Sequence, residues 1–139
     1  MLFKFFKRKQ QPENQLTPNE FEHSNQWNKM WNLWADGKIE SPYDELMSYH
    51  GEVNNGGHYQ FFSNTDNIEN SQSVIEKLSG ILPEELKINL EKAYTAYINL
   101  ENDTDIDFSE QEIKKCDNNF FKNEHIITKI LKNHSEQFR

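Results

Sequence analysis

The stretch GEVNNGGHYQFFSN, residues 51–64, decides the fold, because it interrupts a chain that otherwise reads as helical. It gathers four amide side chains, three glycines and three aromatic rings in fourteen positions, a mixture that regular helices and strands disfavour. The adjacent Gly56 and Gly57 favour turn and left-handed conformations. We therefore predict that one helix ends at these glycines and that a short helix resumes from His58 to Phe62.

Helix signals recur on both sides of this stretch. Thr17-Pro18-Asn19-Glu20 is a capping box with proline at the first helical position. Ser41-Pro42 and Pro83-Glu84 start two more helices in a similar way, and Ser109 with Glu112 forms a further predicted capping box. Because no segment alternates apolar and polar residues as a strand does, the sequence predicts an all-α fold.

Apolar residues at helical spacing predict the buried faces. We expect one compact domain of about six helices over residues 17–139, preceded by a short basic leader and linker over residues 1–16. The predicted core positions are Trp27, Met30, Trp31, Trp34, Leu46, Met47, Val53, Leu86, Leu90, Ala93, Tyr94, Tyr97, Ile113, Cys116, Phe120, Phe121, Ile126, Ile127, Ile130 and Leu131.

The polar side chains of the 51–64 stretch suit a structural joint. Glu52 is placed to end one helix, and Asn54, Asn55, Gln60 and Asn64 offer groups that pair with the free backbone groups at helix ends. Amides do not titrate near neutral pH, so they make poor acids or bases. We expect the aromatic residues Tyr59, Phe61 and Phe62 to fill the corner, and a polar ligand pocket remains the alternative.

The charge is acidic apart from the first nine residues. The chain has 139 residues and a net charge of −8, yet MLFKFFKRK carries four basic residues and no acid. The remainder has 11 basic and 23 acidic side chains, a net charge of −12. Such a body repels nucleic acid and attracts basic partners, so we expect no direct nucleic-acid binding. Residues 1–9 carry a weak alternative, contact with an anionic membrane surface.

The sequence offers little for catalysis or for metal binding. The single cysteine, Cys116, forms no internal disulfide, indicates a cytoplasmic location, and sits on an apolar stripe that predicts an inert buried thiol. His50, Glu52 and His58 flank the glycines, but none of the metal-binding spacings occurs. We predict no enzyme, no cofactor and no metal.

The acidic segment from Glu101 to Glu112 offers a calcium loop as an alternative. Its oxygen side chains fall at the spacing of an EF-hand, but Ile106 occupies the position where the sharp turn requires glycine. An ordinary acidic loop between helices is the prediction.

The central motif resembles the signature of a bacterial family of helical domains named after a Neisseria DNA-mimic protein. The family pattern is close to E-x-x-N-G-G-aromatic-x-Q-aromatic-aromatic-x-N. The matching residues are Glu52, Asn54, Asn55, Gly56, Gly57, Gln60, Phe61, Phe62 and Asn64, and the segment from Cys116 to Phe121 falls where the family keeps a leucine-aspartate-aromatic segment. His58 stands where the family usually has phenylalanine, and Cys116 where it usually has leucine.

This resemblance implies an acidic binding protein that imitates DNA and covers the basic surface of a DNA-binding protein. Helix carboxylates three or four residues apart lie about 5–6 Å from one another, a spacing compatible with a phosphate array. Two alternative functions stay open, an immunity-type inhibitor of a basic toxin or nuclease and a small-molecule binder at the motif. The protein is also a candidate homodimer. The predicted acidic surface comprises Glu84, Glu85, Glu91, Asp103, Asp105, Asp107, Glu110 and Glu112.

Overall fold

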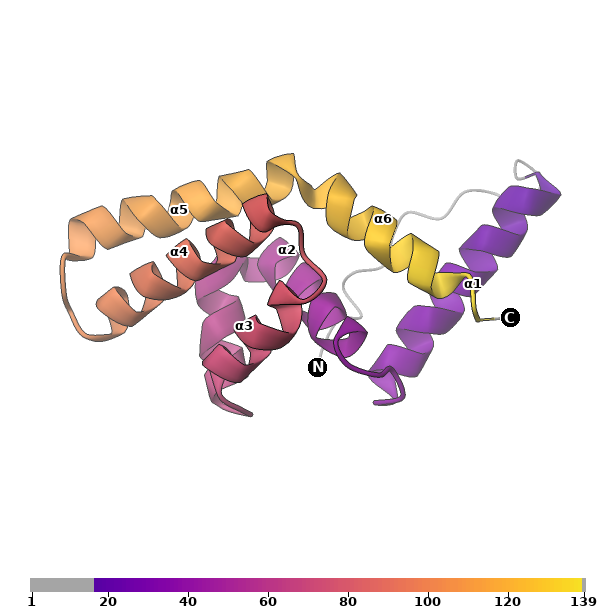
Figure 1. Ribbon diagram of the computed structural model, residues 1–139, viewed down its shortest axis with the longest axis horizontal. Helices are drawn as coiled ribbons and strands as arrows, with labels where there is room; N and C mark the ends of the chain where they lie inside the picture. The colour runs from indigo at the N-terminus through magenta and orange to yellow at the C-terminus, as the bar shows by residue number, and fades with distance from the viewer. Residues whose placement is uncertain (1–16, 139) are drawn as a thin grey trace.

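Six α-helices make up the computed structural model, which describes residues 17–138 (Figure 1), and these residues contain no strand. The all-α prediction and the number of helices are confirmed. The leader and linker over residues 1–16, and the membrane contact through residues 1–9, lie outside the described residues. The helices are α1 (Pro18–Ala35), α2 (Tyr43–Asp66), α3 (Ser71–Ser79), α4 (Glu84–Glu101), α5 (Ile106–Lys122) and α6 (Glu124–Ser135).

The helix starts follow the sequence signals at α1 but not at α5. The capping box is present, since the Glu20 backbone N–H donates to Thr17 Oγ1 at 3.1 Å and the Thr17 N–H donates to Glu20 Oε1 at 2.9 Å. The capping box predicted at Ser109 is wrong. Asp105 adopts a left-handed conformation (φ 45°) and its carbonyl accepts from the Ser109 N–H at 2.8 Å. The helix therefore begins one turn earlier, and Ser109 lies buried inside it.

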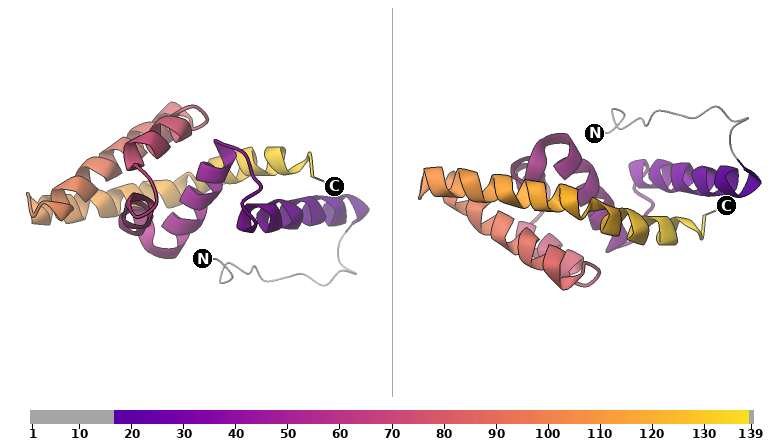
Figure 2. Two further views of the ribbon diagram at one scale, coloured as in Figure 1. Left: turned by 90° about the horizontal axis from the view of Figure 1, so that it is seen from below. Right: turned by 90° about the horizontal axis from the view of Figure 1, so that it is seen from above.

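The second helix, α2, is the centre of the fold. It contacts α3, α4, α5 and α6, whereas α1 packs chiefly against α6. Figure 1 shows α5 and α6 following one another along the length of the molecule, with α4 folded back beside α5 and α1 beside α6 at the other end. Both views in Figure 2 show the same two helix pairs, with α2 between them. No helix within residues 17–138 combines the length and the apolar character needed to cross a membrane.

The core forms where both arms of α2 meet α4, α5 and α6. Tyr49, Phe61 and Phe120 are at most 1% exposed, and both phenylalanine rings lie about edge-on to the Tyr49 ring. Such edge-to-face contacts stabilise the core beyond the contribution of hydrophobic burial. Met30 of the predicted tryptophan stripe is buried, while Trp27, Trp31 and Trp34 pack partly buried against the core. Tyr59 was predicted to fill the corner but is 41% exposed, because Phe61 and Phe62 occupy the corner without it.

Candidate functional site

Gly56 and Gly57 kink α2, so that two helical arms meet there as predicted, and the second arm runs to Asp66 rather than ending at Phe62. Gly56 (φ −153°, ψ 16°) and Gly57 (φ 79°, ψ −179°) have non-helical dihedral angles, and helical structure continues on either side. The Gly57 conformation is one that essentially only glycine adopts. A Cβ atom at Gly57 would also lie 2.6 Å from Asp117 Oδ2 on α5. Gly57 is therefore required both for its dihedral angles and for the close approach of α5.

Three motif side chains near the bend bind one another. Glu52 Oε1 accepts hydrogen bonds from Gln60 Nε2 at 2.8 Å and from Asn64 Nδ2 at 3.0 Å. These contacts join the two arms of α2 across the bend. We expected Gln60 and Asn64 to pair with backbone groups at helix ends. The bend instead brings the Glu52 carboxylate within reach, and hydrogen bonds to an ionised acceptor are the stronger ones.

Asn54 connects the bend to α6. Its Nδ2 donates to the His50 backbone carbonyl at 2.8 Å, which is the helix-end role expected of it, and to Glu124 Oε2 at 2.8 Å. His50 Nε2 lies 3.0 Å from the same Glu124 oxygen. The N–O distance is short, although the angles at His50 Nε2 are not those of a good hydrogen bond. Asn55, the remaining amide of the motif, is exposed.

This contact predicts an acid-sensitive contribution to stability. The neighbouring His50 is the largest cause of a lowered pKa at Glu124, with a smaller contribution from Asn54. A carboxyl with a lowered pKa stabilises the fold fully above its unfolded pKa, near 4.5, and loses that contribution as the pH falls through the folded value. Because Glu124 is partly exposed, we expect Glu124→Gln to cost at most about 1 kcal/mol at pH 6.

Urea unfolding of the wild type and of Glu124→Gln across pH 3 to 7 tests this prediction. The difference in unfolding free energy should shrink as the pH falls below about 4.5. A difference that stays constant across this range would show that Glu124 does not act through its charge.

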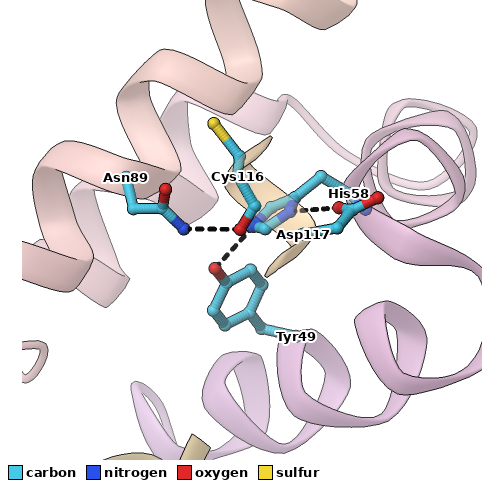
Figure 3. A network of polar contacts seen from close by, with 5 residues as sticks. All are labelled: Tyr49, His58, Asn89, Cys116 and Asp117. Carbon is cyan, nitrogen blue, oxygen red and sulfur yellow. Dashed lines mark hydrogen bonds and ion pairs between the residues drawn. The ribbon is translucent and has the colours of Figure 1, made fainter. Parts of the chain in front are cut away.

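A polar network centred on the fully buried His58 side chain joins the bend to α5 (Figure 3). Asp117 Oδ1 accepts from the His58 backbone N–H at 2.8 Å and lies 2.7 Å from His58 Nδ1. Tyr49 Oη lies 2.7 Å from His58 Nε2. Burial raises the pKa of Tyr49 well above its ordinary value, so its hydroxyl stays protonated and donates to Nε2. Nδ1 then donates to Asp117 Oδ1, and both ring nitrogens have a hydrogen-bond partner.

The same network reaches α4 through Cys116. Asn89 Nδ2 donates to the Cys116 backbone carbonyl at 2.9 Å (Figure 3), so three helices meet at this point. Burial raises the pKa of the Cys116 thiol to about 11, with Glu112 and Asp117 adding to the shift. A thiol that remains protonated at neutral pH is a poor nucleophile, as predicted for an inert buried cysteine.

The geometry on both sides of the bend favours a structural role. Tyr49 and His58 are fully buried, so a substrate has no access to their reactive atoms. Glu52, Gln60 and Asn64 already pair within the chain. Within residues 17–138, no group of three or more His, Cys, Asp or Glu side chains could hold a metal ion.

The predicted acidic residues fall into two groups. Glu84 and Glu85 lie in the first turn of α4, with Glu91 two turns further on. The others lie around the turn from α4 into α5 and along the start of α5, a segment that we call the hairpin tip (residues 101–112). At about 1.5 Å per residue, Glu84 lies about 25 Å along α4 from this segment.

The hairpin tip is the continuous acidic part of the molecule. Glu101, Asp103, Asp105, Asp107, Glu110 and Glu112 contribute six carboxylates without a basic residue among them. All but Glu112, which is half-buried, are exposed. Asp103 and Asp105 have positive φ angles (52° and 45°), which aspartate tolerates better than most residues. In contrast, Lys87 and Lys92 on α4 interrupt the group around Glu84 and Glu91.

These features define a small, acidic, all-helical protein built around a bent central helix. The chain belongs to the DMP19-like protein family, whose model matches residues 45–137. This match covers the bent helix, the buried network and the hairpin tip. Comparisons with curated proteins and with solved structures found no match.

Sequence reasoning missed several residues that hold the bend. Tyr49, Asp117 and Glu124 were not predicted to have site roles. Asp117 did carry a signal, because it is an acid next to the buried stripe of Ile113, Cys116 and Phe120. That signal becomes specific only once the fold places Asp117 opposite His58.

Proposed function

We propose that the protein is an acidic, non-enzymatic, cytoplasmic binding protein that occupies the basic surface of a DNA-binding protein in place of DNA. One observation carries this proposal: the hairpin tip holds a run of six acidic residues, five of them exposed, with no basic residue between them. No ion pair among residues 17–138 involves these six carboxylates. Of the six, Glu101 accepts a hydrogen bond from Tyr59 Oη, and the other five carboxylates remain available to the cations of a partner.

The charge density of the tip supports an electrostatic role. Duplex DNA displays one negative charge per about 1.7 Å of axis, and DNA-binding proteins meet it with lysine and arginine. Asp107 and Glu110 are three residues apart on α5, about 5–6 Å from one another. Such a surface steers a basic partner toward the complex and loses strength as salt screens the charges.

The hairpin tip is also attached to two tightly packed helices, α4 and α5. The α4–α5 hairpin is fixed by the buried side chains of Leu90, Ala93 and Ile113 and by the hydrogen bond from Asn89 to the Cys116 carbonyl. Preorganised carboxylates lose less conformational entropy on binding than flexible ones. This supports recognition through a fixed charge pattern.

Neutralising the tip should remove binding. We expect a variant carrying Asp105→Asn, Asp107→Asn, Glu110→Gln and Glu112→Gln to bind the partner about 10- to 100-fold more weakly. The full chain, immobilised, is exposed to host cytosol at low and high salt, and the retained proteins are identified by mass spectrometry. A basic DNA-binding protein should be retained by the wild type at low salt only.

The matched control neutralises Glu84, Glu85 and Glu91, which lie beside lysines at the other end of α4. This control should retain the partner. Equal retention by the tip variant and the wild type contradicts the proposal. Retention of a basic nuclease or toxin at the tip favours the immunity-type alternative.

A further inference from the structure

An apolar ring stands in the middle of the acidic hairpin tip. Phe108 is 64% exposed, more than any other aromatic side chain described. On α5 its neighbours three and four residues further along the helix are Gln111 and Glu112, and Asp107 and Glu110 lie on the same turns. A large exposed apolar ring thus has the Glu112 carboxylate as a helical neighbour and stands within the acidic hairpin tip.

The exposure of Phe108 follows from the register of α5. The buried stripe of this helix runs through Ser109, Ile113, Cys116 and Phe120. Because successive helical residues differ by about 100°, Phe108 points well away from that stripe. Single exposed apolar residues are common on proteins, and Ile68 is one here at 83%. Phe108 differs because the surrounding charges restrict what chemistry can cover it.

We propose that Phe108 is the apolar anchor of a docking surface for a lysine- and arginine-rich protein segment that itself carries large apolar side chains. The inference rests on the proposed function and names the chemistry of the partner. Basic groups of the segment pair with the carboxylates around the ring, and its apolar groups cover the ring. Buried aromatic anchors surrounded by polar rims dominate many protein interfaces.

This anchor goes beyond imitation of a phosphate array. Carboxylates alone would attract any basic surface, whereas burial of an aromatic ring selects partners with a complementary apolar group. The carboxylates then set the rate of encounter and its salt dependence. Phe108 sets which basic partner remains bound.

Two synthetic peptides test the inference with the full chain. Both have twelve residues with six lysines and a fluorescent label, but the first has leucines between the lysines and the second has serines. Fluorescence anisotropy should show that the wild type binds the leucine peptide about tenfold more tightly than the serine peptide. Phe108→Ser should abolish that preference, because the exposed ring provides it.

The matched control is Ile88→Ser, which removes an apolar side chain that is 42% exposed and lies about 20 Å along α4 from the tip. It should keep the preference for the leucine peptide. Amide chemical shifts should move around residues 103–112 on binding. If Phe108→Ser keeps the preference, or the shifts centre elsewhere, the inference is overturned.

The variant with four neutralised tip residues separates the two proposals. If both peptides bind that variant as they bind the wild type, the tip is not the binding surface and the proposed function fails as well. If binding depends on the carboxylates but not on Phe108, only the anchor is rejected.

Discussion

Gly57→Ala will lower the free energy of unfolding by about 3 kcal/mol. Two costs combine at this position. The backbone conformation (φ 79°, ψ −179°) is strained by about 1–3 kcal/mol for any residue with a Cβ. The new methyl group would also stand 2.6 Å from Asp117 Oδ2, so α5 or the carboxylate must move and the contacts to His58 weaken. Chemical denaturation followed by circular dichroism measures the loss.

Gly37→Ala is the matched control for the backbone cost. Gly37 also has a positive φ angle (72°), but nothing lies within 4 Å of its added Cβ. We expect Gly37→Ala to lower the free energy of unfolding by about 1 kcal/mol. In the Asp117→Ala background, Gly57→Ala should cost at least about 1 kcal/mol less than in the wild type, since the crowded group is gone. Equal costs at Gly37 and Gly57 would contradict the close approach of α5.

Asp117→Ala should be similarly severe, with a loss of about 3 kcal/mol. The carboxylate accepts from both the backbone and the ring of His58, and the His58 side chain has no exposed surface. Without Asp117, two buried N–H donors have no partner, and each such group costs about 1–3 kcal/mol. Asp117→Asn keeps an oxygen acceptor and should lose less. Urea denaturation of both variants at pH 7 makes the comparison.

The Tyr49–His58 contact gives an independent control for this network. His58→Phe leaves the Tyr49 hydroxyl buried without its acceptor, and adding Tyr49→Phe removes that hydroxyl. We expect the double variant to be more stable than His58→Phe alone, because an apolar replacement of both partners is often nearly neutral. If Asp117→Ala costs no more than an ordinary surface substitution, about 0.5 kcal/mol, the buried network does not hold the bend.

Sequence patterns predicted most of the fold because they reflect interactions between residues that are close in the sequence. The α1 capping box, the glycine pair and the apolar stripes each depend on residues within a few positions of one another. The start of α5 was misplaced because Asp105 adopts a left-handed conformation that a serine-to-glutamate spacing does not reveal. The Ser109–Glu112 spacing is typical of a capping box, but the helix starts one turn earlier, at Ile106.

The site was predictable only in part, because its contacts span distant segments. Glu52, Gln60 and Asn64 were recognised, but their mutual pairing depends on the angle of the bend. The contact between His58 and Asp117 joins residues 59 positions apart, and no local pattern encodes it. The acidic residues of the hairpin tip lie close together in the sequence, so the sequence alone predicted this acidic segment.

Displacement of DNA tests the central claim most directly. The retained basic partner is bound to a labelled duplex, and the full chain is titrated in while fluorescence anisotropy follows release of the DNA. The wild type should release the duplex at low salt, and the variant neutralised at Asp105, Asp107, Glu110 and Glu112 should not. If the wild type binds the partner while the duplex stays bound, the hairpin tip does not occupy the DNA-binding surface.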